Sequence, residues 1–282
     1  MSIAFVLSGG ASLGAIQVGM LQALSERHVL PDYVFGASAG AFNAAWVAGD
    51  PTLAGIDELA EIWISLRRND IFPLRPVTGL LGFLGRRTSL VSPEGARSLV
   101  ARHVRFERLE DAPIPLCVIA TEVISGKEIA LTRGNAVDAI LASAAIPGVF
   151  PPVVIGERTL MDGAVVNNTP ISNAIDAGAT RIYVLPTSYA CTLTEAPRSA
   201  LAVTLQAISL LVQQRLIEDV KELQGAVDLR VIPPLCPLAV APTDFTHARE
   251  LIDEARERAG HWLDDVAANE SEHQSGNIVH PH

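Results

Sequence analysis

The pentapeptide GASAG at residues 36–40 restricts the fold of this sequence more than any other feature. It stands between a short apolar segment, 33–35, expected to be a strand, and a run of small residues, 39–48, expected to be a helix. A serine in a G-x-S-x-G pattern at such a junction lies on a sharp turn, and the residues around it must lack bulky side chains. The N-terminus of the following helix favours negative charge at that serine. The pattern therefore predicts a nucleophile at Ser38 on an α/β fold; a serine that only caps a helix is the alternative.

A second glycine-rich turn occupies residues 8–14, after the apolar run Ile3–Leu7, which we expect to be the first strand. Dinucleotide-binding turns have the order G-x-G-x-x-G and an acidic residue at the end of the second strand. Here the order is G-G-x-x-x-G, and Asp32 precedes the second strand. No Gly-Lys-Ser/Thr follows, so a Walker loop is excluded. The turn is either a purely structural connection or a place where backbone amides hold an anion.

The rest of the chain alternates between expected strands and helices, which indicates a mainly parallel sheet with helices on both faces. We predict a three-layer α/β/α fold in one domain, residues 1–266, followed by a polar, disordered tail, residues 267–282. The further strands are expected at 115–123, 127–131, 181–185 and 229–232, with two short ones around 156–157, and the last helix at 246–264.

Composition excludes some classes of function. The net charge of -10 argues against nucleic acid as a partner, because phosphate binding needs clustered Lys and Arg. The three cysteines form no C-x-x-C pair, so they give no metal or disulfide signal and suit a reducing compartment. The N-terminal segment lacks the basic region of a signal peptide, and no apolar run reaches the roughly 20 residues of a membrane span. These features predict a cytoplasmic protein.

A serine nucleophile needs a base, and the best candidate is a carboxylate. His247 and His261 lie on the expected terminal amphipathic helix, where surface positions are the simpler explanation, and His103 lies in an arginine-rich region. Asp162, in contrast, ends an expected strand and precedes Gly163, a position at the rim of a parallel sheet where active sites occur. An ordinary Asp-Gly turn is the alternative.

Taken together, the glycine turn, the GASAG pentapeptide and the segment Asp162–Ala164 resemble the patatin-like phospholipase family. The linking segments 118–126 and 142–152 are similar to that family as well, and the likeness extends over Ile3–Leu185. The chain departs from the family at Ala11, where a third glycine is usual, and at Leu13, where a basic residue is common.

The resemblance implies a Ser38–Asp162 dyad without histidine. We expect no cofactor and no metal, since the sequence shows no clustered carboxylate loop for calcium. Ser38 would attack the acyl carbonyl and Asp162 would take its proton. The oxyanion would be held by the N–H groups of Gly9, Gly10 and Ala11. The implied reaction is hydrolysis of carboxylic esters of lipids, as by a phospholipase A, a lysophospholipase or an esterase. Acyl transfer or thioester hydrolysis with the same dyad, and a catalytically idle lipid-binding protein, are the alternatives.

The segment 70–92 is too apolar for an ordinary linker and lies in a region rich in arginine. We interpret it as a lid or lipid-entry insert, with Phe72 and Phe83 meeting acyl chains and Arg86 and Arg87 meeting anionic head groups at a membrane surface. A packed irregular loop and a contact between copies of the chain are the alternatives. The sequence leaves the oligomeric state open.

Overall fold

The computed structural model describes residues 1–72, 89–187, 200–223, 225–236 and 240–276. Its centre is an eight-stranded sheet with the order β5-β6-β3-β2-β1-β7-β8, and β4 pairs with β3 beside this path. The strands from β3 to β8 along that order run parallel, whereas β4 and β6 run antiparallel to β3. The strands are β1 (Ile3–Leu7), β2 (Tyr33–Ala37), β3 (Leu116–Glu122), β4 (Glu128–Leu131), β5 (Val153–Ile155), β6 (Arg158–Asp162), β7 (Arg181–Leu185) and β8 (Asp228–Val231).

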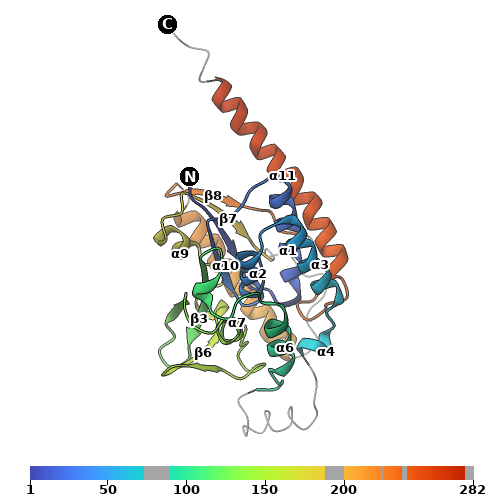
Figure 1. Ribbon diagram of the computed structural model, residues 1–282, viewed down its shortest axis with the longest axis vertical. Coiled ribbons are helices and arrows are strands. Elements are labelled where there is room, and N and C mark those ends of the chain that lie inside the picture. Colours follow the sequence, from blue (N-terminus) through green and yellow to red (C-terminus); the bar gives the residue numbers. More distant parts are fainter. Residues whose placement is uncertain (73–88, 188–199, 224, 237–239, 277–282) are drawn as a thin grey trace.

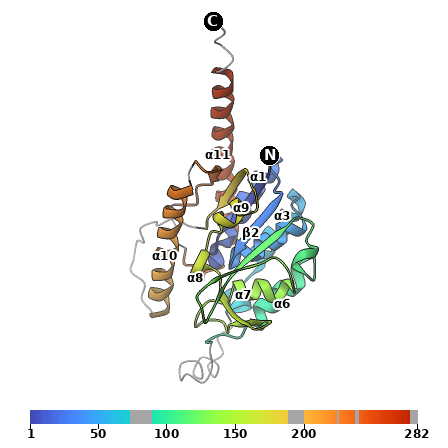
Figure 2. The ribbon, with the colours of Figure 1, turned by 90° about the vertical axis from the view of Figure 1, so that its left-hand side faces the viewer.

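Helices cover both faces of the sheet, which confirms the predicted three-layer α/β fold (Figures 1 and 2). Successive strand residues point to opposite faces, so Phe5 packs in one core cluster and Val6 in another. The Phe5 cluster includes α1, α2, α3, α6, α7 and α11, and the Val6 cluster includes α9 and α10. The helices are η1 (Ala11–Leu13), α1 (Gly14–Glu26), α2 (Ala39–Gly49), α3 (Leu53–Ser65), α4 (Arg68–Ile71), α6 (Glu94–His103), η2 (Leu109–Asp111), α7 (Ala136–Ser143), α8 (Ala164–Asn167), α9 (Ile171–Asp176), α10 (Ala200–Leu223) and α11 (Ala248–Gly276).

Strands β2 and β6 lie on the same edge of β3 and run toward each other. Ile119 of β3 pairs with Ala37 of β2 and also with β4, while Ala120 pairs with Asp162 of β6 and also with β4. A strand residue has only two lateral neighbours, so β4 must occupy one edge of β3 and both β2 and β6 the other. The C-terminal ends of β2 and β6 therefore meet, at Ser38 and Asp162.

Asp162 ends a strand and lies at the carboxyl end of the parallel strands, because it is hydrogen-bonded to Ser38, which directly follows β2. Its own strand departs from the parallel pattern: β6 is antiparallel to β3, enters from that rim and stops after three pairs with β3.

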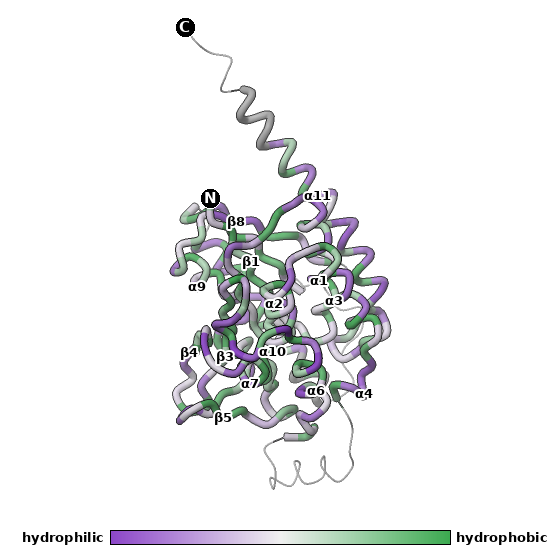
Figure 3. The backbone as a smooth tube through the Cα atoms, in the orientation of Figure 1, coloured by the Kyte–Doolittle hydropathy of each residue, from purple (hydrophilic) through white to green (hydrophobic). Residues whose placement is uncertain are grey.

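Two further expectations differ from the structure. Helix α11 continues to Gly276, past the residue 266 at which the sequence analysis ended the domain, into the segment expected to be a polar tail. Hydrophilic and hydrophobic positions alternate along its packed part, which lies against α1 (Figure 3). Cys236 is disulfide-bonded, whereas the cysteine spacing in the sequence gave no disulfide signal. None of the helices in the described part of the chain combines the length and apolarity that a bilayer crossing requires.

The small residues of α2 are required by close contact with β1. A Cβ atom on Gly40 would lie 2.3 Å from the Leu7 carbonyl oxygen, whereas one on Gly49, in the same helix, would meet nothing closer than 3.5 Å. We expect Gly40→Ala to lower the free energy of unfolding by about 2 kcal/mol or more, because backbone cannot yield. Gly49→Ala, the matched control, should leave it unchanged or raise it slightly. Equal urea midpoints for the two variants would contradict the tight β1–α2 contact.

Candidate active site

Ser38 occupies a strained turn between β2 and α2. Its φ of 54° and ψ of -125° are unusual for a residue with a side chain, and such strain of about 1–3 kcal/mol is found where function requires it. The turn is possible because residue 36 is glycine and has no Cβ, which would otherwise come within 2.5 Å of the Gly40 carbonyl oxygen. The Ser38 N–H donates to the buried Ser143 Oγ at 2.8 Å, which holds the turn from the α7 side.

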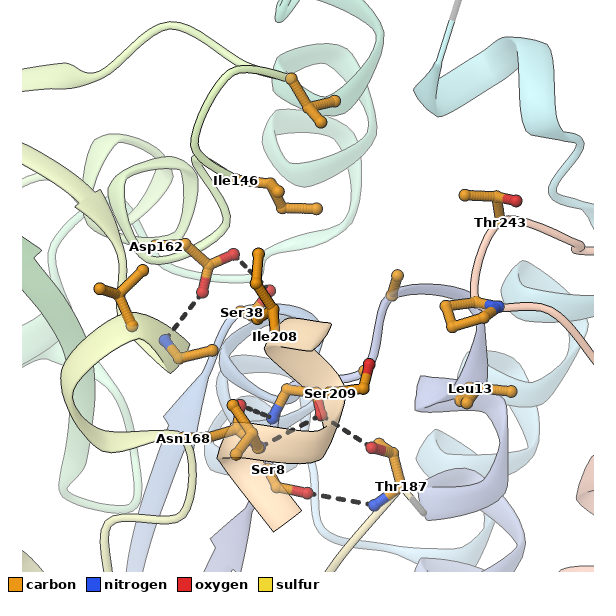
Figure 4. Close-up of a pocket in the computed structure, with 18 of the residues that line it drawn as sticks. Ser8, Leu13, Ser38, Ile146, Asp162, Asn168, Thr187, Ile208, Ser209 and Thr243 are labelled. Carbon is orange, nitrogen blue, oxygen red and sulfur yellow. Dashed lines mark hydrogen bonds between the residues drawn. The ribbon is translucent and has the colours of Figure 1, made fainter. Parts of the chain in front are cut away.

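The Asp162 carboxylate faces Ser38 across the junction of β2 and β6 (Figure 4). Ser38 Oγ donates to Asp162 Oδ2 at 2.8 Å, and Asp162 Oδ1 accepts the Ala164 N–H at 2.8 Å. Both side chains are buried, Ser38 at 6% and Asp162 at 3% exposure. Burial raises the pKa of Asp162 from 3.8 to about 6, against the lowering effect of the hydrogen bonds from Ala164 and Ser38. A carboxyl group of this pKa can exchange a proton with a serine near neutral pH.

The described histidines do not replace this carboxylate. Two cavities, described below, adjoin Ser38, and no histidine whose side chain the structure describes lines either of them. His247 lies on the surface, where its ring is 2.9 Å from Glu250 Oε2, and His103 packs beside the Trp46 ring. The surface positions expected for the terminal-helix histidines therefore agree with the structure at His247.

The glycine loop lies beside Ser38, but its three predicted amides are not equivalent. The Gly9 N–H donates to Asn168 Oδ1 at 3.0 Å, so it can serve an oxyanion only if the Asn168 amide moves. Among the described residues, no hydrogen-bond acceptor meets the N–H of Gly10 or of Ala11. Ala11 has a φ of 52°, a left-handed conformation that favours glycine, so the family departure at this position carries backbone strain. Both Gly10 and Ala11 line the cavity that contains Ser38 and Asp162.

Buried polar side chains hold the glycine loop in place. The Gln17 Nε2 group donates to the carbonyl oxygens of Ser8 and Leu185, each at 2.8 Å. Gln17 Oε1 in turn accepts from Asn43 Nδ2 at 2.9 Å, and Asn43 Oδ1 accepts the Trp63 indole N–H at 2.8 Å. Because these groups are satisfied inside the protein, they fix the loop relative to α2 and α3 without exposing it to water.

A cavity of about 180 Å³ opens over the Ser38–Asp162 pair; we call it the catalytic cavity (Figure 4). Its walls come from the glycine loop, α8, α10 and the segment 242–243. Polar groups of Ser8, Asn168 and Thr187 border it, and exposed Arg68 lies at its edge. Within the described residues no group of three metal-binding side chains occurs.

The structure brings together most of the residues singled out in the sequence. Ser38, Asp162, Gly9, Gly10, Ala11 and Phe72 all line the catalytic cavity. The predicted lipid contacts Phe83, Arg86 and Arg87 lie outside the described residues, with most of the expected insert 70–92. The C-terminal end of the expected insert, at Leu90 and Val91, borders the catalytic cavity. The N–H groups of these two residues donate to the Gly148 and Val149 carbonyl oxygens, each at 3.0 Å.

Sequence reasoning missed Ser143, Asn168, Thr187 and Gln17. Asn168 follows the Asp-Gly turn in a polar run, and Thr187 lies two residues after the end of β7, so both occupy positions where small polar residues signal a site. Ser143 and Gln17 lie within helices, and nothing in the sequence pattern distinguishes them from ordinary helix residues.

The fold and the site define an α/β protein in which a serine on a nucleophile elbow faces a buried carboxylate. The sequence profile of the patatin-like phospholipase family matches residues 5–175, and the chain belongs to that family. This match confirms the resemblance drawn from the glycine turn, the pentapeptide and the Asp-Gly segment.

Individual relatives share the same region. The chain is 29% identical over 180 residues to patatin-like phospholipase domain-containing protein 7 of Rattus norvegicus, covering 63% of this chain and 13% of that protein. It is 33% identical over 171 residues to an uncharacterised NTE family protein of Mycobacterium tuberculosis, a match that covers 60% of this chain and 44% of that protein. The chain thus spans less than half the length of these relatives. The crystal structure of VipD from Legionella pneumophila is similar in fold, with a TM-score of 0.50 and 14% identity over 94% of this chain and 67% of that one.

Thr187 offers a test of how the glycine loop is held. Its Oγ1 donates to the Gly9 carbonyl oxygen at 2.7 Å, and its N–H donates to Ser8 Oγ at 3.1 Å. Thr187→Val keeps the shape and removes the hydroxyl, so we expect the free energy of unfolding to fall by about 1 kcal/mol. Thr187→Ser keeps the hydroxyl and should stay closer to the wild type in urea denaturation. If the valine variant proved as stable as the wild type, the loop would not depend on this hydrogen bond.

Proposed function

We propose that this protein is a serine lipid acyl hydrolase that cleaves carboxylic esters through Ser38 and Asp162. The supporting observation is the 2.8 Å hydrogen bond between Ser38 Oγ and a carboxylate that is buried and has a pKa near 6. The family to which the chain belongs favours lipid esters, and the cavity over the dyad is lined largely by apolar side chains.

In the proposed reaction the Ser38 Oγ–H proton passes to Asp162 Oδ2 as Oγ attacks the ester carbonyl carbon. The negative charge on the carbonyl oxygen is met by the N–H groups of Gly10 and Ala11 and by the N-terminus of α2, which begins directly after Ser38. The C–O bond to the alcohol then breaks, and Asp162 returns the proton to the alcohol oxygen. Water repeats the sequence on the acyl-enzyme: Asp162 takes a proton from water, and hydroxide adds to the carbonyl carbon. The bond from that carbon to Ser38 Oγ then breaks, the carboxylic acid leaves, and Asp162 returns the proton to Oγ.

The substrate is proposed to be a phospholipid, a lysophospholipid or a simpler acyl ester, taken from or near a membrane surface by a cytoplasmic protein. Arg68, at the edge of the catalytic cavity, is placed to meet an anionic group of the leaving alcohol. Acyl transfer or thioester cleavage uses the same dyad and differs only in the group that accepts or leaves; product analysis with added acceptor alcohols separates these reactions.

Substitution of either Ser38 or Asp162 tests the proposed dyad. The wild type should hydrolyse p-nitrophenyl esters, and the rate should be at least about 10³-fold lower in Ser38→Ala and in Asp162→Asn. Removing one member of a nucleophile–base unit costs about as much activity as removing both. Circular dichroism and urea denaturation should show that both variants fold. Activity that survives Ser38→Ala would exclude Ser38 as the nucleophile, and loss of activity in His247→Ala alone would point to a histidine base.

The pH dependence follows from the burial of Asp162. Only the ionised carboxylate accepts a proton, so kcat/KM should decline as pH falls through the Asp162 pKa, raised by burial to about 6. The plateau should lie above pH 7. A midpoint near 4, the value of a solvated aspartate, would contradict a buried base. The measurement is the kcat/KM profile on a p-nitrophenyl ester whose spontaneous hydrolysis is subtracted at each pH.

A further inference from the structure

A second cavity of about 90 Å³ meets the catalytic cavity at Ser38. The two share four lining residues: Ala11, Ser38, Phe72 and Ile146. We call the second one the aromatic cavity, because it is bordered by five aromatic rings; these are Phe42, Trp63, Phe72, Phe150 and Phe245. Helices α2, α3, α6 and α7 supply about half of its described lining residues.

Among the described residues that line the aromatic cavity, Ser38 alone carries a polar side chain, apart from the Trp63 indole. The Trp63 N–H is already bonded to Asn43 Oδ1 at 2.8 Å, and the Ala11 N–H lies where the two cavities meet. A head group placed there would lose its hydrogen bonds to water without replacement, which costs several kcal/mol. An alkyl chain, in contrast, gains about 0.8 kcal/mol for each methylene that leaves water. The ligand that fits this lining is a hydrocarbon chain.

The walls of the aromatic cavity are ordered by ring packing. Trp63 stacks on Phe245, with ring centroids 6.3 Å apart and an interplanar angle of 11°, and Phe72 stacks on Phe150 at 5.5 Å and 21°. Phe72 also touches the Phe245 ring at 6.1 Å, so the two stacks form one wall. The same Trp63 is bonded through Asn43 to Gln17, which holds the glycine loop. The cavity is therefore built on the frame that positions the reacting groups.

The position of Asp162 decides which part of an ester enters which cavity. Asp162 lines the catalytic cavity and does not line the aromatic one. In the proposed reaction it must protonate the leaving alcohol and later activate water, so both must approach Ser38 from the catalytic cavity. The carbonyl carbon at Ser38 carries one other carbon substituent, the acyl chain. That substituent is left to the other cavity that Ser38 lines, the aromatic one.

We propose that the aromatic cavity binds the acyl chain of the substrate and sets the chain length that the enzyme accepts, while the catalytic cavity takes the alcohol. This inference rests on the proposed function and adds the assignment of the two halves of the ester. Ala96 and Leu99 are both partly buried on α6, and they line the aromatic cavity but not the catalytic cavity. Their size should therefore determine how far the acyl chain extends.

The first experiment compares p-nitrophenyl esters from acetate to decanoate. For the wild type we expect kcat/KM to rise about threefold to fourfold for each methylene that enters the cavity, then to level off. Ala96→Phe should fill the cavity, end the rise at a shorter chain and lower kcat/KM for the longest effective ester about tenfold, the equivalent of roughly two methylenes. Leu99→Ala should move the plateau to longer chains. Ala101→Phe, an exposed position on the same helix, is the matched control and should change nothing.

A reciprocal variant tests the other half of the assignment. Val165, on α8, lines the catalytic cavity and is 49% exposed, so a larger side chain fits there without disturbing the core. Val165→Phe should change the preference among alcohol groups in a series of butyrate esters. The dependence of kcat/KM on acyl-chain length should stay the same as in the wild type. An acyl profile that shifts with Val165→Phe and not with Ala96→Phe would overturn the assignment.

The second experiment does not depend on turnover. Fatty acids brominated near the methyl end are titrated into the Ser38→Ala variant, and tryptophan fluorescence is recorded, since heavy atoms quench a fluorophore near contact. Quenching should be saturable, and most of it should disappear when Trp63→Phe is added. Quenching without ester hydrolysis by the wild type would refute the proposed function and keep the alkyl cavity. Ester hydrolysis with no quenching that depends on Trp63 would refute the cavity and keep the function.

Discussion

The site depends on the meeting of two strand ends along one edge of β3. Ala37 pairs with Ile119 and Asp162 pairs with Ala120, so neighbouring β3 residues fix the ends of β2 and β6. The chain separates Ser38 from Asp162 by 124 positions, yet their hydrogen bond is 2.8 Å long. A slip of one residue in either pairing would turn the side chains to the opposite face of the sheet. The pairing of Ser38 with Asp162 therefore depends first on sheet register. Gly163 keeps the end of β6 close to β3, because a Cβ there would lie 2.1 Å from the Ile119 carbonyl oxygen.

Burial of Asp162 favours its proposed role as a base and costs stability. A carboxyl group whose pKa rises from 3.8 in the unfolded chain to about 6 in the fold is held more easily in its neutral form. The stabilisation that Asp162 contributes is therefore fully present below pH 3.8 and is lost as the pH rises through about 6. The free energy of unfolding falls by roughly 3 kcal/mol over this range. The two hydrogen bonds to the carboxylate, from Ser38 and from Ala164, limit this loss. The large apolar core on both sides of the sheet has to offset the rest.

Much of the fold could be predicted from the sequence because local patterns carried it. The alternation of apolar strands and helices gave the layers, and the pentapeptide gave the elbow, since only small residues permit a turn in which a Gly36 Cβ would lie 2.5 Å from a carbonyl oxygen. The antiparallel direction of β6 could not be predicted, because strand direction depends on pairing far along the chain. The same holds for Asn168, whose oxygen takes the Gly9 N–H, and for Ser143, whose hydroxyl accepts the Ser38 N–H. Those partners are set by tertiary contact and leave no spacing in the sequence.

Ala11 shows how a departure visible in the sequence acquires physical meaning only in the structure. Its φ of 52° places an alanine where glycine would be unstrained, at a cost of about 1–2 kcal/mol. The conformation persists because the next residues are tied down: the Ser12 N–H donates to Pro242 O at 3.0 Å and the Leu13 N–H to Gly10 O at 3.1 Å. Ala11 also lines both the catalytic and the aromatic cavity. Its backbone strain therefore lies where the proposed mechanism places the ester carbonyl, next to the N–H groups proposed to hold the oxyanion.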